Sequence, residues 1–325
     1  MDVLFLFAMV IGLLLIGVPI AVSLGLSSTL FLLIYSGSSL GSVAGTLFEA
    51  FEGHFTLLAI PYFILASAFM TTGGVAQRII RFSIACVGHL PGGLAIAGVF
   101  ACMLFAALSG SSPATVVAIG TIVIAGMRQV GYTRDFAAGV ICNAGTLGIL
   151  IPPSIVMVVY AASVDVSVGR MFLAGVIPGL LAGLMLMTTI YVMAKLRDLP
   201  KGDWKGWCEI WASGRDAAWG LFLIVIILGG IYGGIFTPTE AAAVAAVYAF
   251  VIATFVYRDM GPLATTGADG NTPLWRKPQA LITAFVHPDT RDTLLQAGKL
   301  TVTLLFVIAN ALLPKHVLTA EQIPQ

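Results

Sequence analysis

Long apolar segments alternate with short polar ones along most of the chain. The apolar segments lie near residues 3–35, 54–72, 93–108, 113–127, 136–163, 171–194, 217–235, 239–257 and 299–313. These runs are long enough for helices, and they lack the strict alternation of polar and apolar residues that is typical of a membrane β-barrel. The pattern therefore predicts an all-α, polytopic membrane protein, with several arms too short to cross a bilayer by themselves.

Composition supports this class and excludes others. Hydrophobic residues make up 59% of the chain and charged residues 10%, against about 25% charged residues in soluble domains. We therefore expect the lipid bilayer as its surroundings, and the net charge of +1 gives no reason to expect nucleic acid as a partner. Four cysteines and four histidines are scattered singly and HExxH is absent, so we expect no cofactor and no enzymatic activity.

The first apolar segment permits two interpretations. It carries Asp2 in place of a basic start, and its apolar character continues past Pro19, so we expect it to be retained and not cleaved as a signal peptide. Proline removes a helix hydrogen bond, so Pro19 marks the expected break. The segment is either one tilted, kinked span or two short arms.

A first polar break interrupts the apolar sequence at "ALSGSSPATV", residues 107–116. We expect one half-helix to end near Leu108 and another to begin at Pro113, with the Ser112 hydroxyl as its cap. Ser109, Gly110 and Ser111 would then expose hydroxyls and backbone carbonyls, which cannot face lipid without a cost of several kcal/mol each.

A second break lies in "NAGTLGILIPPS", residues 143–154. Pro152 and Pro153 lack N–H groups, so carbonyls around Gly148 to Ile151 are expected to lose their helical partners, and Asn143 adds a side-chain amide. Two such breaks are typical of a binding site at the membrane midplane, although helix kinks and small-residue packing would leave the same pattern. Neither break has a carboxylate, which favours a sodium ion held by carbonyls and hydroxyls over a proton relay. A half-helix N-terminus favours an anionic substrate group.

Lysines and arginines predict the topology. They gather in two segments, residues 195–215 and 258–299, which we expect on the cytoplasmic side, with the turn "GGIFTPTE" between them on the opposite side. Trp204, Trp207, Trp211 and Trp219 beside the first basic segment indicate an interfacial amphipathic helix. In the turn, Thr237, Pro238 and Glu240 have the spacing of a capping box, so we interpret them as a structural cap and not as ligands.

The chain resembles one transporter family over essentially its whole length. The motifs are "LSGSSPATVVAIG" and "NAGTLGILIPPS" within residues 108–181, "FEGHFTLLAIPYFILASAFMTTGG" before them and "GGIYGGIFTPTEAAAVAAVYAF" after them. They are similar to those of the large membrane subunit of the tripartite ATP-independent periplasmic (TRAP) transporters, the DctM-like family.

The resemblance implies a sodium-driven importer of small organic anions, such as dicarboxylates, sugar acids or keto acids, in the bacterial inner membrane. It implies an elevator-type fold with inverted repeats, a small four-helix membrane subunit as partner, and a periplasmic substrate-binding protein that delivers the solute. By motif match, the first sodium site would use Ser109, Ser112, Gly148, Ile151 and Pro152, with Ser111 and Asn143 as substrate-side neighbours.

The same resemblance suggests a division of the chain. We expect residues 1–92 to be scaffold helices, 93–194 the first-repeat transport region with a re-entrant hairpin and a broken helix, 195–216 a cytoplasmic amphipathic connector, 217–257 a helix pair, 258–298 a cytoplasmic loop, and 299–325 the start of a second repeat. After Pro152 and Pro153 no further Pro-Pro or Ser-Gly-Ser-Ser break appears before Gln325, so the second repeat is expected to be incomplete. Two alternatives stay open: a sodium/anion symporter that needs no binding protein, and a non-transporting assembly subunit or fragment.

Overall fold

The computed structural model describes residues 2–35, 41, 44–45, 48, 55–72, 74–263 and 280–320. Within these ranges the chain is helical, and an isolated bridge between Pro91 and Lys201 is the one β feature. The chain divides into two compact units, one of residues 1–57 with 299–325 and one of residues 58–298. The all-α fold expected from the hydropathy pattern is confirmed.

The first unit contains a helical hairpin. Helix α1 (Asp2–Leu15) and helix α2 (Ile20–Tyr35) are separated by a turn in which Gly17 has a φ of 91°. The rings of Phe5 and Tyr35 lie 5.7 Å apart, so the start of α1 lies beside the end of α2. The first apolar segment is therefore two antiparallel arms, and the turn falls at Pro19 because proline cannot continue the hydrogen bonding of α1.

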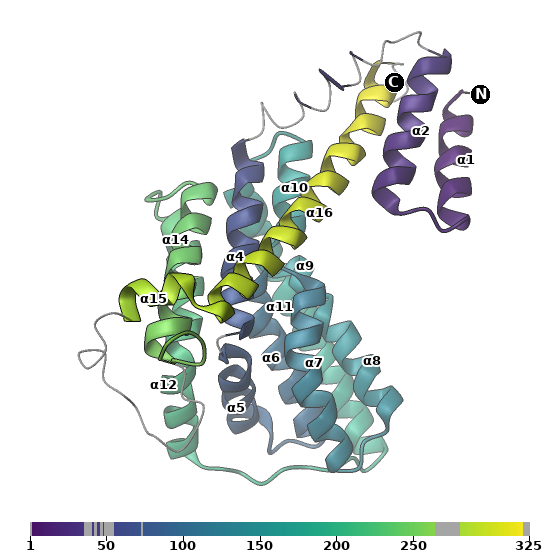
Figure 1. Ribbon diagram of the computed structural model, residues 1–325. Helices are drawn as coiled ribbons and strands as arrows, with labels where there is room; N and C mark the ends of the chain where they lie inside the picture. Colours follow the sequence, from purple (N-terminus) through teal and green to yellow (C-terminus); the bar gives the residue numbers. More distant parts are fainter. Residues whose placement is uncertain are drawn as a thin grey trace. The chain divides into compact units, whose positions relative to one another are not determined.

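The second unit holds the remaining helices except the C-terminal part of α16 (Figure 1). They are α4 (Ala59–Thr72), α5 (Val75–Val87), α6 (Gly93–Ser109), α7 (Ser112–Gln129), α8 (Arg134–Gly145), α9 (Leu147–Leu150), α10 (Ile155–Ser163), α11 (Val168–Leu196), α12 (Trp207–Ile224), α13 (Gly230–Tyr232), α14 (Pro238–Val251), α15 (Ala280–Val286) and the start of α16 (Pro288–Ala320). A 3-10 turn, Phe55–Leu58, precedes α4, and π-helical turns continue α12 and α14 at Val225–Gly229 and Ile252–Val256.

Helix α6 is the centre of this unit. It contacts α5, α7, α8 and α11 (Figure 1). Nearly all of its side chains are buried. A helix enclosed in this way needs apolar residues all round, which explains why its sequence has no polar face. Gly98 of α6 lies against Val123 of α7 and Ile141 of α8, so the three helices approach closely at that level.

Five helical segments of the described chain are long and apolar enough to cross a membrane. They are Phe55–Thr72, Val168–Leu196, Trp207–Tyr232, Pro238–Val256 and Pro288–Pro314. A sixth candidate is bent by 43° at the break between Leu150 and Ile155, and α6 is among the shorter apolar helices, as its sequence predicted. The chain is therefore polytopic, with one broken helix at the position of the second sequence break.

The tryptophan-rich segment differs from the prediction of a separate interfacial helix. Trp207 begins α12, and the helix runs without interruption into a candidate span that ends at Tyr232. The Trp207 and Trp211 side chains are 77% and 81% exposed, consistent with an aromatic anchor at the first turns of a span. The helix continues because residues 207–224 contain no proline that would interrupt its hydrogen bonding.

A polar network joins α12 to two other elements near this end. The Tyr257 hydroxyl donates to the Asp216 carbonyl at 2.7 Å and accepts from the Gly220 N–H at 3.0 Å. Burial raises the pKa of the Tyr257 phenol, so this donor stays protonated at neutral pH. Arg78 of α5 lies 3.9 Å from the centre of the Tyr257 ring and also pairs with Asp259. The network fixes the end of the α14 span against α5 and α12. Of the predicted loop 258–298, residues 264–279 lie outside the described part.

Candidate functional site

The first break is a two-residue turn between α6 and α7. Gly110 ends α6 with a φ of 59°, and Ser111 is the N-cap of α7 in an extended conformation. The Ser111 carbonyl accepts the first helical hydrogen bond, from the Thr115 N–H at 3.1 Å. The prediction of Ser112 as cap and Pro113 as first helical residue was wrong by one position. Pro113 occupies the second position of α7 instead, where its missing N–H also has no helical partner to lose.

Two buried hydroxyls line this turn. Ser109 is 1% exposed and Thr115 is fully buried, and their side-chain oxygens lie 2.9 Å apart. Both side chains also donate to the Ser111 carbonyl, at 3.2 Å from Ser109 and 2.9 Å from Thr115. The turn therefore concentrates three oxygen atoms in a buried position without a charged group among them.

The second break consists of α9, one helical turn long, and the residues up to Ser154. Ile151 ends α9, and its N–H donates to the Leu147 carbonyl at 2.8 Å. The carbonyls of Gly148 and Ile149 would be bonded by residues 152 and 153 in a continuous helix, but both are prolines without an N–H. The carbonyls of Gly148 and Ile149 are therefore the two for which proline removes the helical donor.

The two breaks touch each other. The Ile155 N–H at the start of α10 donates to the Gly110 carbonyl at 3.1 Å, which links the tip of the first break to the second. A Cβ atom on Gly148 would lie 3.0 Å from the Ser112 nitrogen and 3.1 Å from the Ser111 carbonyl oxygen. Glycine is thus the residue that permits backbone to meet backbone here. We refer to residues 109–112, 148 and 151–155 as the tip contact.

The structure places most of the predicted site residues at the tip contact, but not all of them. Ser109, Ser111, Ser112 and Gly148 come together there, and the buried Ile151 and Pro152 directly follow α9. Asn143 lies on α8, where its side chain is exposed and its amide donates to the Gly139 carbonyl of the same helix at 2.8 Å.

Sequence reasoning missed two polar residues of this region. Thr115 lies one helical turn after Ser111 and therefore faces the same turn, a spacing that could have revealed it. Ser154 is fully buried at the N-cap of α10, and its hydroxyl has no hydrogen-bond partner among the described residues. A serine directly after a proline pair, at the start of the next apolar run, was the available signal.

The donor set suits a weakly charged cation. All its oxygens are hydroxyls or carbonyls, which hard cations prefer, and a buried hydroxyl without a partner has unused capacity as a ligand. The described residues contain no group of three or more histidines, cysteines or carboxylates that could hold a transition metal. The N-termini of α7 and α10, which carry partial positive charge, both reach the tip contact and favour an anion beside it.

Comparison with known proteins identifies the family. Residues 7–325 match the model of the "Tripartite ATP-independent periplasmic transporter, DctM component". The C4-dicarboxylate TRAP transporter large permease protein of Vibrio cholerae is 68% identical over 325 residues, which is all of this chain and 71% of that protein. Its counterpart in Pseudomonas aeruginosa is 59% identical over 303 residues, 93% of this chain and 65% of that protein.

A more distant relative has a different substrate in its name. The 2,3-diketo-L-gulonate TRAP transporter large permease protein of Escherichia coli is 36% identical over 324 residues, all of this chain and 70% of that protein. These relatives are transporter permeases and not enzymes. Together with the apolar spans, they make this chain a multi-pass protein of the inner membrane. The chain belongs to the DctM family, the large membrane subunits of TRAP transporters.

Proposed function

We propose that this large subunit imports small organic anions by sodium symport, with the first sodium site at the tip contact. C4-dicarboxylates are the proposed substrates, because the relatives with 68% and 59% identity are named for them. A periplasmic binding protein delivers the solute and a small membrane subunit accompanies the large one, as the tripartite family description implies.

One observation carries the sodium assignment: the hydrogen bond between Ile155 and Gly110, which holds two oxygen-rich breaks together inside apolar sequence. Ser109, Ser112, Gly148, Ile151 and Pro152 are the proposed ligands, and Thr115 and Ser154 extend the set. A bound sodium ion is coordinated by carbonyl and hydroxyl oxygens of both breaks, which favours the state in which the two breaks are in contact.

The tip contact also accounts for anion recognition in this proposal. The starts of α7 and α10 direct backbone N–H groups toward the same region, and a carboxylate accepts such donors favourably. Ser111 and Asn143 are kept as substrate-side neighbours. Asn143 would have to release its bond to the Gly139 carbonyl before its amide could take part.

The test is sodium-dependent uptake of succinate into proteoliposomes that contain the complete gene product with its small subunit and binding protein. Ser112→Ala should reduce uptake at limiting sodium and recover part of it at high sodium, because one ligand of the ion is lost. Ser167→Ala is the matched control, since Ser167 is an exposed N-cap at the start of α11 and should behave like wild type. Equal uptake by the two variants at every sodium concentration would refute the assignment.

A further inference from the structure

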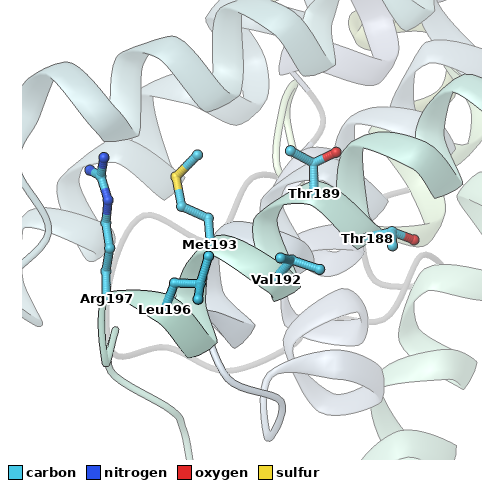
Figure 2. Close-up of a pocket in the computed structure, with 6 residues that line it drawn as sticks. All are labelled: Thr188, Thr189, Val192, Met193, Leu196 and Arg197. Carbon is cyan, nitrogen blue, oxygen red and sulfur yellow. The ribbon is translucent and has the colours of Figure 1, made fainter.

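The outer face of α11 carries a groove that the tip contact does not use. Figure 2 shows the groove, which has a volume of about 470 Å³, and the side chains that line it: Thr188, Thr189, Val192, Met193, Leu196 and Arg197. The opposite face of the same turns is buried through Ile190 and Ala194. The groove is therefore open on the side that points away from the rest of its unit.

The walls of this groove are apolar in spite of two threonines. The Thr188 hydroxyl donates to the Leu184 carbonyl and the Thr189 hydroxyl to the Met185 carbonyl, both at 2.8 Å. These hydroxyls are thus satisfied within the helix, as a lipid-facing position requires. Val192 is 50% exposed and Leu196 80% exposed, so the groove offers an aliphatic surface to whatever covers it.

Arg197 stands at one end of the groove and is held in place by the backbone. Its N–H donates to the Met193 carbonyl, and Asp198 has a φ of 48° while the Leu199 N–H bonds back to Ala194, which is a Schellman ending of α11. Figure 2 shows the Arg197 and Met193 side chains projecting to the same side of the helix. The segment just beyond is anchored too, because the Tyr132 hydroxyl donates to the Pro200 carbonyl at 3.1 Å and the Gly202 N–H donates to the Gly88 carbonyl at 3.1 Å.

The charge of Arg197 is available to a ligand. Within residues 74–263 no carboxylate lies within 4.0 Å of its guanidinium, and the side chain is exposed. The neighbouring Lys195 does not share this position, since its ammonium lies 5.0 Å from the centre of the Tyr191 ring.

We propose that the α11 groove binds one anionic phospholipid, with an acyl chain along residues 188–196 and the phosphate on the Arg197 guanidinium. The ten residues from Thr188 to Arg197 extend about 13 Å along the helix axis, close to the roughly 15 Å of hydrocarbon in one leaflet. The surplus of lysine and arginine after α11 places this end in the cytoplasmic leaflet, which carries anionic lipids. The charge and the apolar length therefore fit the same molecule.

A second groove on the molecule provides a comparison for the role of Arg197. It has a similar volume of about 480 Å³ and lies along α14, where it is lined by Ala243, Val244, Val247, Tyr248 and Val251. The Tyr248 hydroxyl is occupied, as it donates to the Trp219 carbonyl at 2.7 Å. The described residues that line this groove include no cation, so they offer an acyl chain a surface without selecting the head group.

The experiment is native mass spectrometry of the purified full chain titrated with phosphatidylglycerol or phosphatidylcholine of the same acyl chains. The wild-type chain should prefer phosphatidylglycerol by about fivefold at its tightest site. Arg197→Gln should remove this preference, and Arg197→Lys should keep most of it. Arg170→Gln is the matched control, because Arg170 is exposed near the other end of α11.

The two grooves supply a second pair of variants. Val192→Trp fills the α11 groove and should weaken the tightest site for both lipids, while Val247→Trp in the α14 groove should leave the head-group preference unchanged. Equal preference in Arg197→Gln and Arg170→Gln would overturn the proposal, provided that both retain wild-type helicity by circular dichroism. Loss of the small subunit or of self-association in Arg197→Gln, with lipid binding unchanged, would also overturn it, because the face would then be a protein interface.

Discussion

Helices α7 and α14 begin with nearly the same sequence signal and differ in how their first turns are satisfied. Both starts pair a hydroxyl residue with proline, at Ser111 to Pro113 and at Thr237 and Pro238. Thr237 accepts from the Glu240 N–H, and the Glu240 carboxylate accepts from the Thr237 N–H at 2.8 Å, which completes the predicted capping box. Ser111 makes no such bond with its side chain.

The comparison shows that burial of the polar groups, and not the sequence motif, distinguishes the candidate site at α7 from the structural cap at α14. The cap of α14 is exposed and satisfies itself locally, so it needs no further partner. At the start of α7, the Ser111 carbonyl accepts hydrogen bonds from the buried side chains of Ser109 and Thr115. The adjacent N-cap of α10, Ser154, is also buried, and its side chain makes no cap bond. Ser167 also lacks a cap bond, but it is exposed, and water can complete its hydrogen bonding.

The largest expected effect on stability comes from separating the two breaks. Gly148→Ala would set a Cβ 3.0 Å from the Ser112 nitrogen, against backbone that has little room to move. We expect it to lower the free energy of unfolding by about 1–3 kcal/mol and to reduce sodium-dependent uptake. Thermal unfolding followed by circular dichroism measures the first effect.

Gly139→Ala is the matched control for this change. A Cβ on Gly139 meets nothing within 4 Å, and the residue lies on the exposed side of α8. Alanine there should leave stability unchanged or raise it by up to about 1 kcal/mol. If Gly148→Ala behaved like Gly139→Ala, the two breaks would not be in contact.

The next effect tests the structural cap. Thr237→Ala removes the side-chain acceptor of the Glu240 N–H and should lower the free energy of unfolding by about 1 kcal/mol. Because the capping box is exposed and distinct from the tip contact, the sodium concentration for half-maximal uptake should not change. A shift in that concentration would instead indicate that Thr237 or Glu240 takes part in transport.

The smallest effect on stability is expected at Ser154. Its buried hydroxyl has no hydrogen-bond partner among the described residues, so Ser154→Ala loses no bond and removes a desolvated polar group. The free energy of unfolding should stay within about 0.5 kcal/mol of wild type or rise. Sodium affinity should fall roughly tenfold, the value of one polar interaction. Unchanged sodium affinity would remove Ser154 from the proposed site.

Local sequence signals predicted the positions of both breaks but not their contact. Proline and glycine interrupt helices whatever the tertiary surroundings, so the end of α6 and the start of α7 were predicted to within one residue. The one-residue error at Ser111 arose because either serine can cap, and the backbone conformation decides. The bond between Ile155 and Gly110 joins residues 45 positions apart, and no local pattern encodes such a tertiary contact.

Other parts of the prediction were limited by similar physics. Hydropathy alone did not distinguish one kinked span from the α1–α2 hairpin, because both satisfy the same apolar length. It also did not show that the tryptophan segment continues into α12, since an interfacial helix and the first turns of a span have the same composition. The capping box at Thr237 was predicted correctly because all of its interactions lie within four residues.

Sodium-dependent thermal stability is the most direct test of the central claim that the tip contact holds the ion. The full chain is unfolded by heat in sodium and in potassium at equal ionic strength, as wild type, Ser109→Ala, Ser154→Ala and Thr237→Ala. Saturation at about 100 times the dissociation constant should stabilise the wild type by about 2.7 kcal/mol. The account predicts that Thr237→Ala keeps this sodium increment, while Ser109→Ala and Ser154→Ala, which bind sodium about tenfold more weakly, keep only about 1.4 kcal/mol of it at the same sodium concentration. An increment of equal size in all four proteins, or none in the wild type, would contradict it.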